Sequence, residues 1–338
     1  MKIMKTGAAR AVITAILAVA SFLALMIGAT AVAQPDDQLR RIFENSPPIA
    51  ENLEYGTFKA VPITGTFSAS DPDGDELTFE ITAAPKKGDA APDGASSFVY
   101  TPAENARGKD SFEYVAVDTA GNASAPATVS ITIRKRAAKT SYADMDGSSA
   151  QYAALVLAEE GIFTGEKLGE AWFFHPEREV TRGEFLAMCM QLNGGEVIKG
   201  VTRTGFYDDD AIPAWVKPYI STGLVAGVIN GYRNDEGKLV FSPQNPITFF
   251  EAAVVLDNLL NITSVTEAGV SESGVVPAWA AAASANLTAC KILPAGVSEY
   301  SDGTVTRAEA AEMLTAAAAL LDARDGGRSL LSLISGKR

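Results

Sequence analysis

The stretch Val180-Thr181-Arg182-Gly183-Glu184 has two echoes later in the chain, Ile247-Thr248-Phe249-Phe250-Glu251 and Val305-Thr306-Arg307-Ala308-Glu309. In each, a threonine stands three residues before a glutamate and an apolar helical pattern follows, which is the signature of a capping box. The threonine hydroxyl accepts a hydrogen bond from the N–H of the glutamate, whose carboxylate accepts from the N–H of the threonine. We therefore expect three helices that begin with the capping pairs Thr181 and Glu184, Thr248 and Glu251, and Thr306 and Glu309.

Capping does not explain the arginine that follows the threonine in two of these stretches. Arg182 and Arg307 stand at the positive end of the helix dipole, where a cation gains nothing. Their recurrence at equivalent positions indicates a task outside helix initiation, such as binding an anion beside exposed N-terminal amides. For a single occurrence, a solvated arginine would be the simpler interpretation.

The similarity between the three stretches extends upstream. Segments beginning at Ser149, Trp215 and Trp279 align without a gap, and each runs into an apolar helical pattern. A glycine-bearing loop and then the capping box follow, with Phe174-His175-Pro176 and Phe241-Ser242-Pro243 between them in the first two units. Units of helix, loop and helix that recur in this way predict a repeat architecture whose units pack on one another.

The shared order of these motifs resembles that of three S-layer homology (SLH) repeats, at residues 141–194, 205–262 and 271–322. The resemblance rests on acidic starts, tryptophans, Gly-x-x-x-Gly loops, Phe-x-Pro steps and Thr-Arg-x-Glu. It implies an all-α, pseudo-threefold bundle in which the second helices meet and grooves lie between neighbouring repeats. It also implies non-covalent anchoring of an exported protein to cell-wall polysaccharide, typically a pyruvylated secondary polymer.

The resemblance further implies which residues bind the polymer. Arginine offers a planar fork of donors to the carboxylate of a pyruvate ketal, and tryptophan offers an apolar face to a sugar ring. The aspartates at the start of the repeats would bond sugar hydroxyls or orient the arginine, although they could equally be caps, and the tryptophans could equally be core residues. The polysaccharide-binding residues implied by motif position are Asp144, Arg182, Asp208, Trp215, Trp279 and Arg307.

Two departures reduce the number of sites that the sequence predicts. Ser149 stands where the first tryptophan is expected, and Phe249 stands where the second arginine is expected. No single repeat carries the aspartate, the tryptophan and the arginine together. If a groove draws on neighbouring repeats, one complete site can still be assembled, for example from Arg182 with Trp215, and three sites are not expected.

Residues 47–134 have a different pattern. Leu77-Thr78-Phe79-Glu80-Ile81 and Val129-Ser130-Ile131-Thr132-Ile133 alternate apolar and polar residues, as strands with one buried face do. Turn signals separate such runs and predict a β-sandwich. Together with Phe98-Val99-Tyr100-Thr101-Pro102, these runs are similar to bacterial immunoglobulin-like or cadherin-like modules of surface proteins. The expected fold class is therefore multidomain, an N-terminal all-β sandwich plus a C-terminal all-α bundle of three helix-loop-helix SLH repeats.

One turn of the sandwich raises the question of calcium. Asp71, Asp73 and Asp75 surround Gly74 at alternate positions, as in the first half of an EF-hand loop. The twelfth position of such a loop is Thr82 here rather than a bidentate glutamate. A tight turn, in which aspartate, proline and glycine each serve the backbone, is the interpretation that we favour. No other cofactor is expected.

The two ends of the chain differ from the domains between them. Residues 1–33 carry three basic residues and then an uncharged run that ends in Ala31-Val32-Ala33, which predicts a signal peptide and export. The uncharged run is long, so an uncleaved membrane helix is the alternative. Residues 34–46 read as a linker, residues 135–140 as a solvated basic hinge, and residues 323–338 as a tail to which we assign no role.

Charge and composition exclude several classes of function. The chain has 28 basic and 41 acidic residues, and loss of the signal peptide would change its formal net charge from −13 to −16. Such a protein repels nucleic acid and anionic membranes. His175 is the only histidine, and no phosphate loop or metal-ligand motif is present, so we do not expect an enzyme. Cys189 and Cys290 lie in different repeats; an exported protein could join them in a disulfide, but we favour two thiols.

The sequence thus predicts a secreted protein at the cell wall, with cell-wall polysaccharide and other surface proteins as partners and no membrane span after signal removal. The sandwich would be a spacer or an adhesive module. The alternative is a degenerate SLH bundle that binds another protein and has lost its polysaccharide site. No pattern in the sequence identifies the sugar or the ligand of the sandwich.

Overall fold

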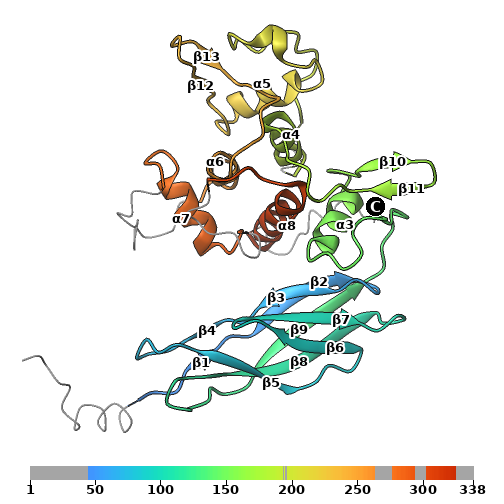
Figure 1. Ribbon diagram of the computed structural model, residues 1–338, viewed down its shortest axis with the longest axis vertical. Helices are drawn as coiled ribbons and strands as arrows, with labels where there is room; N and C mark the ends of the chain where they lie inside the picture. Colours follow the sequence, from blue (N-terminus) through green and yellow to red (C-terminus); the bar gives the residue numbers. More distant parts are fainter. Residues whose placement is uncertain (1–44, 193, 195, 263–275, 294–301, 325–338) are drawn as a thin grey trace, which may run out of the picture.

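The computed structural model describes residues 45–192, 194, 196–262, 276–293 and 302–324. A β-sandwich comes first along the chain and a helical bundle follows it (Figure 1). The predicted signal peptide, most of the linker and most of the C-terminal tail lie outside the described residues. In the described part of the chain, none of the helices has both the length and the hydropathy needed to cross a membrane.

Two sheets form the sandwich. Alternation is clearest in β9, where Val129, Ile131 and Ile133 are buried and the residues between them are not. The core between the sheets contains Phe98 and Phe112, whose rings meet edge to face. The first sheet, in spatial order, is β2 (Leu53–Phe58), β9 (Ala127–Arg134), β8 (Gly108–Val117) and β5 (Thr78–Ala83), with β2 parallel to β9. The second is β3 (Ile63–Thr66), β7 (Ser97–Pro102) and β6 (Gly88–Asp93), and β1 (Ile49–Ala50) pairs with β4 (Ala69–Ser70). The predicted all-β domain is confirmed.

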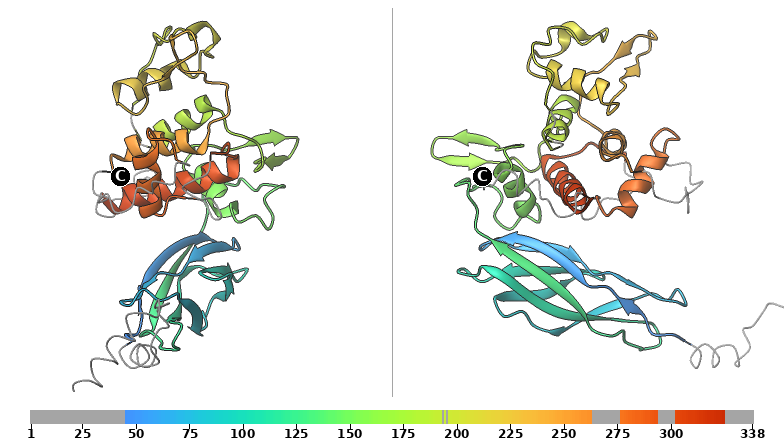
Figure 2. Two further views of the ribbon diagram at one scale, coloured as in Figure 1. Left: turned by 60° about the vertical axis from the view of Figure 1, so that its left-hand side comes forward. Right: turned by 180° about the vertical axis from the view of Figure 1, so that it is seen from behind.

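The bundle contains two helices from each of the three repeats. The first helices are α3 (Gln151–Glu159), α5 (Lys217–Val225) and α7 (Ala281–Ala289), and the second helices are α4 (Arg182–Leu192), α6 (Phe249–Leu260) and α8 (Arg307–Arg324). The second helices meet one another, as predicted. Each first helix packs on the second helix of the preceding repeat: α5 on α4, α7 on α6, and α3 on α8 (Figures 1 and 2). The last of these pairs closes the ring.

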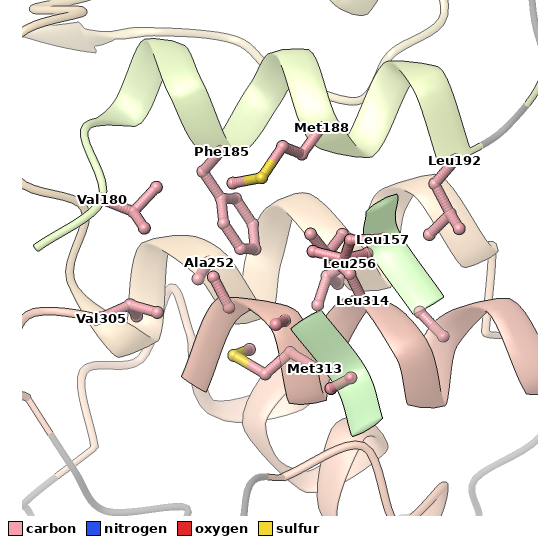
Figure 3. Close-up of a cluster of buried hydrophobic side chains, with 14 of the residues drawn as sticks. Leu157, Val180, Phe185, Met188, Leu192, Ala252, Leu256, Val305, Met313 and Leu314 are labelled. Carbon is pink, nitrogen blue, oxygen red and sulfur yellow. The ribbon is translucent and has the colours of Figure 1, made fainter. Parts of the chain in front are cut away.

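Backbone hydrogen bonds hold the three repeats at the centre of this ring. Val180 N donates to Val305 O, Val305 N donates to Ile247 O, and Ile247 N donates to Val180 O, each at 2.9 Å. All three side chains are buried. Figure 3 shows apolar side chains of α3, α4, α6 and α8, among them Phe185 and Leu256, that converge beside Val180 and Val305. Each repeat therefore supplies one residue of the cycle just before its capping box.

Short elements that the sequence did not predict connect the helices. A hairpin of β10 (Glu166–Leu168) and β11 (Ala171–Phe173) lies between the helices of repeat 1. A smaller hairpin of β12 (Tyr232–Arg233) and β13 (Leu239–Val240) occupies the same place in repeat 2. A 3-10 turn, Asp209–Ala211, precedes α5. The two hairpins place loop residues beside the helix starts of the neighbouring repeats.

The sandwich and the bundle share a packed contact. The ring of Tyr152 on α3 lies 5.4 Å from that of Phe58 on β2, and Arg134 donates to the Tyr152 hydroxyl at 3.2 Å. Ala137 N and Ala138 N donate to the Glu159 carboxylate at 2.6 and 2.8 Å. The prediction of a solvated hinge at residues 135–140 misses these bonds, because a carboxylate from the end of α3 binds the backbone of this segment.

Candidate functional site

The three predicted capping boxes are present. Thr181 N donates to Glu184 Oε2 at 2.9 Å, and Glu184 N donates to Thr181 Oγ1 at 3.2 Å. The corresponding distances are 3.0 and 3.3 Å for Thr248 and Glu251, and 2.7 and 3.3 Å for Thr306 and Glu309. Each second helix therefore has a defined start, and the residue after each threonine has a fixed position beside a neighbouring repeat.

The N-terminal amides of the second helices are not exposed, contrary to the expectation of an anion site there. Arg182 N and Gly183 N donate to Asn245 O and Pro243 O, both at 2.9 Å. At α8, Arg307 N donates to the Arg178 carbonyl at 2.8 Å, and the next amide donates to Pro176 O at 3.0 Å. The loop of the following repeat thus satisfies these donors, and they are not available to a ligand.

Asp144 and Asp208 hold the loops that make these bonds. The two carboxylate oxygens of Asp144 accept from Phe174 N at 2.9 Å and His175 N at 2.7 Å. Asp208 does the same for Phe241 and Ser242, at 3.0 and 2.8 Å. The middle residue of each Phe-x-Pro step has a positive φ, 56° for His175 and 52° for Ser242, which costs a non-glycine residue about 1–3 kcal/mol. Of the roles predicted for the two aspartates, orientation of the arginine fits these contacts. The loop that each aspartate holds accepts a hydrogen bond from an arginine through its phenylalanine carbonyl.

Arg182 lies between repeats 1 and 2. Its Nε donates to the Phe241 carbonyl at 2.9 Å, and its Nη1 lies 2.5 Å from Glu251 Oε1. Its guanidinium carbon is 5.4 Å from the centre of the Tyr232 ring. Glu251 thus joins its own capping box to the neighbouring arginine. Within the described residues, Arg182 Nη2 makes no hydrogen bond, although the side chain is only 13% exposed.

A groove of about 420 Å³ opens beside Arg182. Trp279, at the start of repeat 3, forms part of its wall and is 60% exposed. The indole meets the Phe250 ring edge to face, with centroids 6.4 Å apart. The remaining lining residues include Val228, Ile229, Asn230, Tyr232, Glu251 and Asn258. The suggested pairing of Arg182 with Trp215 was wrong, because the tryptophan in this groove comes from repeat 3.

Arg307 occupies the equivalent position between repeats 3 and 1. Its Nη1 donates to the Phe174 carbonyl at 3.0 Å, and its Nη2 donates to Glu166 Oε1 at 3.3 Å. The side chain is 6% exposed, with its guanidinium carbon 4.9 Å from the centre of the Phe163 ring. The space beside it is about 10 Å³, roughly the room that one water molecule needs. Trp215 is 54% exposed at the start of α5 and does not line this space.

The third position has lost both groups, as the sequence indicated. Phe249 replaces the arginine and is buried. Ser149 replaces the tryptophan, and its hydroxyl lies 3.3 Å from Glu312 Oε1. The three positions between repeats are therefore chemically different.

The acidic turn of the sandwich forms bonds to its own backbone. Asp71 Oδ1 accepts from Asp73 N at 2.8 Å and from Asp75 N at 3.2 Å, and Asp73 Oδ2 accepts from Ser46 N at 2.7 Å. Across the described residues, no three acidic, histidine or cysteine side chains are arranged to hold a metal ion. Calcium binding at this turn stays a prediction that the geometry does not favour. Cys189 and Cys290 are free thiols.

Comparison with protein families agrees with this architecture. The model of the bacterial cadherin-like domain matches residues 45–135, and that of the S-layer homology domain matches residues 141–186 and 205–253. The chain joins a bacterial cadherin-like domain to S-layer homology domains. Repeat 3 lies beyond the matched residues, but α7 and α8 take the same places in the ring as the helices of the matched repeats.

Individual proteins are more distant. No curated protein matches the chain. An endo-fucoidan hydrolase of glycoside hydrolase family 107 is 22% identical over 27% of this chain and 14% of that chain, with a TM-score of 0.23. The SrpA adhesin from Streptococcus sanguinis is 19% identical over 29% of this chain and 63% of that chain, with a TM-score of 0.21. The chain thus spans a small part of the hydrolase and less than two thirds of the adhesin, and similarities this low do not bear on function.

Both domain families are non-catalytic surface modules. SLH domains anchor proteins at the cell wall or surface, and a cadherin-like domain suggests a spacer or an adhesive module. The sequence prediction missed Tyr232, Glu251 as a partner of Arg182, and Asn258. An alignment of the repeats could have identified Glu251, since its counterparts occur in all three capping boxes. The equivalent position of repeat 1 is Glu166 rather than a tyrosine, so the same comparison could not reveal Tyr232.

Proposed function

We propose that this protein is secreted and held non-covalently at the cell wall by its SLH bundle, which binds a pyruvylated polysaccharide in the groove between Arg182 and Trp279. The cadherin-like domain is the spacer or adhesive module, and the protein is not an enzyme. The observation that carries this proposal is the groove itself. The arginine of repeat 1, two amide side chains of repeat 2 and the exposed indole of repeat 3 all line it.

The chemistry of the groove suits a sugar that carries a carboxylate. Glu251 and the Phe241 carbonyl bind Nη1 and Nε of Arg182 and fix the guanidinium plane. Nη2 is left as a charge-assisted donor for the carboxylate of a pyruvate ketal. Because Glu251 offsets much of the arginine charge, the carboxylate alone contributes little, and the sugar ring must add contacts with the exposed indole of Trp279.

The size of the groove supports the same ligand. A volume of about 420 Å³ lies within the ordinary range for small-molecule sites. Asn230 and Asn258 supply amide groups for sugar hydroxyls, although Asn258 already donates one hydrogen bond, to Val228 O at 3.1 Å.

Binding to purified cell-wall sacculi tests the proposal. We expect the protein to co-sediment with intact sacculi and to stay in solution once the secondary polymer has been extracted. Arg182→Lys retains the charge but loses the planar fork of donors. It should therefore weaken binding by at least about tenfold, which corresponds to 1.4 kcal/mol.

Arg203→Ala is the matched control, because Arg203 is largely exposed and lies outside the groove. It should bind like the wild type. Co-sedimentation that does not depend on the polymer would contradict the proposal and favour the alternative of a protein-binding bundle.

A further inference from the structure

The space beside Arg307 and the Arg182 groove lie at equivalent places between neighbouring repeats, but different residues line them. Alignment of the Gly-x-x-x-Gly loops places Phe163 where repeat 2 has Ile229, and Glu166 where repeat 2 has Tyr232. The arginines, the capping glutamates and the phenylalanine carbonyls correspond in the two places. Phe163 and Glu166 are therefore two of the substitutions that distinguish the closed space from the open groove, and Met188 in the place of Val255 is another.

Phe163 fills the space that a ligand would need. Its ring lies against the Arg307 guanidinium and meets Phe174 edge to face, with centroids 5.5 Å apart. Ile229, at the same position in the other groove, is smaller, and the side chain of Arg182 lines that groove. The difference agrees with the two volumes, about 10 Å³ beside Arg307 and about 420 Å³ beside Arg182.

Glu166 occupies the donor that a ligand would use. Arg307 Nη2 donates to Glu166, whereas Arg182 Nη2 has no hydrogen bond within the described residues. Arg178 pairs with Glu166 at 3.0 Å and with Glu184 at 3.6 Å, so the charges around Arg307 form a balanced ion-pair network. A ligand carboxylate would have to displace Glu166 from two arginines. In the Arg182 groove the corresponding loop residue, Tyr232, has no carboxylate, and the one carboxylate paired with Arg182, Glu251, binds Nη1.

We infer that this SLH bundle has a single polymer-binding groove, because Phe163 and Glu166 close the second one, and that Ile229 and Tyr232 keep the first one open. The inference rests on the proposed function and adds the number of sites and the residues that set it. Arg307 is then a joint between repeats 3 and 1 rather than a ligand for the polymer.

Exchange of these residues between the repeats tests the inference. One variant, Phe163→Ile with Glu166→Tyr, gives repeat 1 the residues of repeat 2. The reciprocal variant, Ile229→Phe with Tyr232→Glu, gives repeat 2 the residues of repeat 1. Every introduced residue already occurs at the equivalent place in this fold, and circular dichroism and thermal unfolding establish that each variant is folded.

Isothermal titration with a polymer fragment of one pyruvylated repeating unit then counts the sites. We expect one equivalent for the wild type, two for the first variant, and for the reciprocal variant a loss of at least about tenfold in affinity, or 1.4 kcal/mol.

Two equivalents for the wild type, or a folded first variant that still binds one, would overturn the inference while leaving the proposed function intact. A folded reciprocal variant that retains wild-type affinity would overturn it as well. Absence of binding by the wild type would instead reject the proposed function.

Discussion

The arginines of the Thr-Arg-x-Glu stretches join neighbouring repeats. Arg182 and Arg307 each donate to the phenylalanine carbonyl of the next repeat, and each pairs with a carboxylate of that repeat. Within the described residues, Arg182 Nη2 makes no hydrogen bond, and Arg182 lines a groove of about 420 Å³. The same motif therefore serves as a joint in both places, and we propose a binding role for one of them. Repetition in the sequence alone does not distinguish the two.

Asp208 illustrates a structural role for a residue predicted to bind the ligand. Its carboxylate holds the N–H groups of Phe241 and Ser242, and Phe241 in turn accepts from Arg182. We expect Asp208→Ala to lower the free energy of unfolding by about 2 to 3 kcal/mol, because two backbone donors lose a charged acceptor. Urea unfolding followed by circular dichroism measures this change.

The control for this prediction is Asp235→Ala, which removes an exposed carboxylate from the β12–β13 hairpin. It should change stability by less than about 0.5 kcal/mol. If Asp208→Ala were as stable as this control and lost only polymer binding, Asp208 would be a ligand residue and not a clamp.

The sequence predicted part of the site at this scale. The capping pairs follow from a local spacing, so a single stretch is enough to identify them. The partners of Arg182 come from repeat 2 and the tryptophan of its groove from repeat 3, and local spacing does not specify contacts between repeats. For this reason Arg182 and Trp279 were both named as site residues, but Arg182 was given the wrong tryptophan.

At the scale of secondary-structure elements, the sequence predicted which faces of the helices are buried but not which helix packs on which. The apolar helical patterns after the capping boxes, together with the resemblance to SLH repeats, indicated that α4, α6 and α8 would meet. These patterns do not show that each first helix packs on the preceding repeat, since helical periodicity carries no information about the identity of the neighbour. The closing contact of α3 on α8 depends on the whole ring.

Asp110 is one of two buried carboxylates of the sandwich, with Asp118, and it makes the stability of this domain depend on pH. Asp110 accepts from the Tyr100 hydroxyl at 2.7 Å and from Lys86 N and Lys87 N at 3.0 and 2.9 Å. Burial alone would raise the pKa of Asp110, but these bonds and one from Ser111 N outweigh it and hold the pKa below its ordinary value. A pKa that is lower in the folded state gives stability at neutral pH that is lost as the pH falls below about 4.

We therefore expect the free energy of unfolding of the sandwich to fall more steeply between pH 6 and pH 3 in the wild type than in Asp110→Asn, with the variant less stable at pH 6. Tyrosine fluorescence or circular dichroism during urea unfolding gives the two curves. Other carboxylates titrate in both proteins, so parallel curves would show that Asp110 does not contribute.

At the scale of the whole molecule, the two domains meet through a packed contact. Tyr152 packs against the cores of both the sandwich and the bundle, and Arg134 at the end of β9 donates to its hydroxyl. Lys291 donates to Ser68 at 3.2 Å, which adds a bond between repeat 3 and the sandwich. In Figures 1 and 2 the sandwich lies against one side of the bundle, and repeat 2 projects from the far side.

This contact predicts a rigid connection between the domains. Tyr152→Ala removes the ring that packs against both cores. We expect this variant to retain two folded domains but to broaden the distribution of dimensions in small-angle X-ray scattering. Tyr207→Ala, an exposed position on repeat 2, is the control. A wild-type distribution as broad as that of Tyr152→Ala would contradict the rigid connection.

The most direct test of the whole account compares two tryptophans at equivalent places in the ring. Trp279 lines the open groove, whereas Trp215 stands at the start of α5 outside the closed space, and both are largely exposed. Polymer affinity should fall at least about tenfold in Trp279→Ala and stay unchanged in Trp215→Ala, with both variants as stable as the wild type. Equal losses of affinity in the two variants, or a loss only in Trp215→Ala, would contradict the placement of the cell-wall anchor in the Arg182 groove.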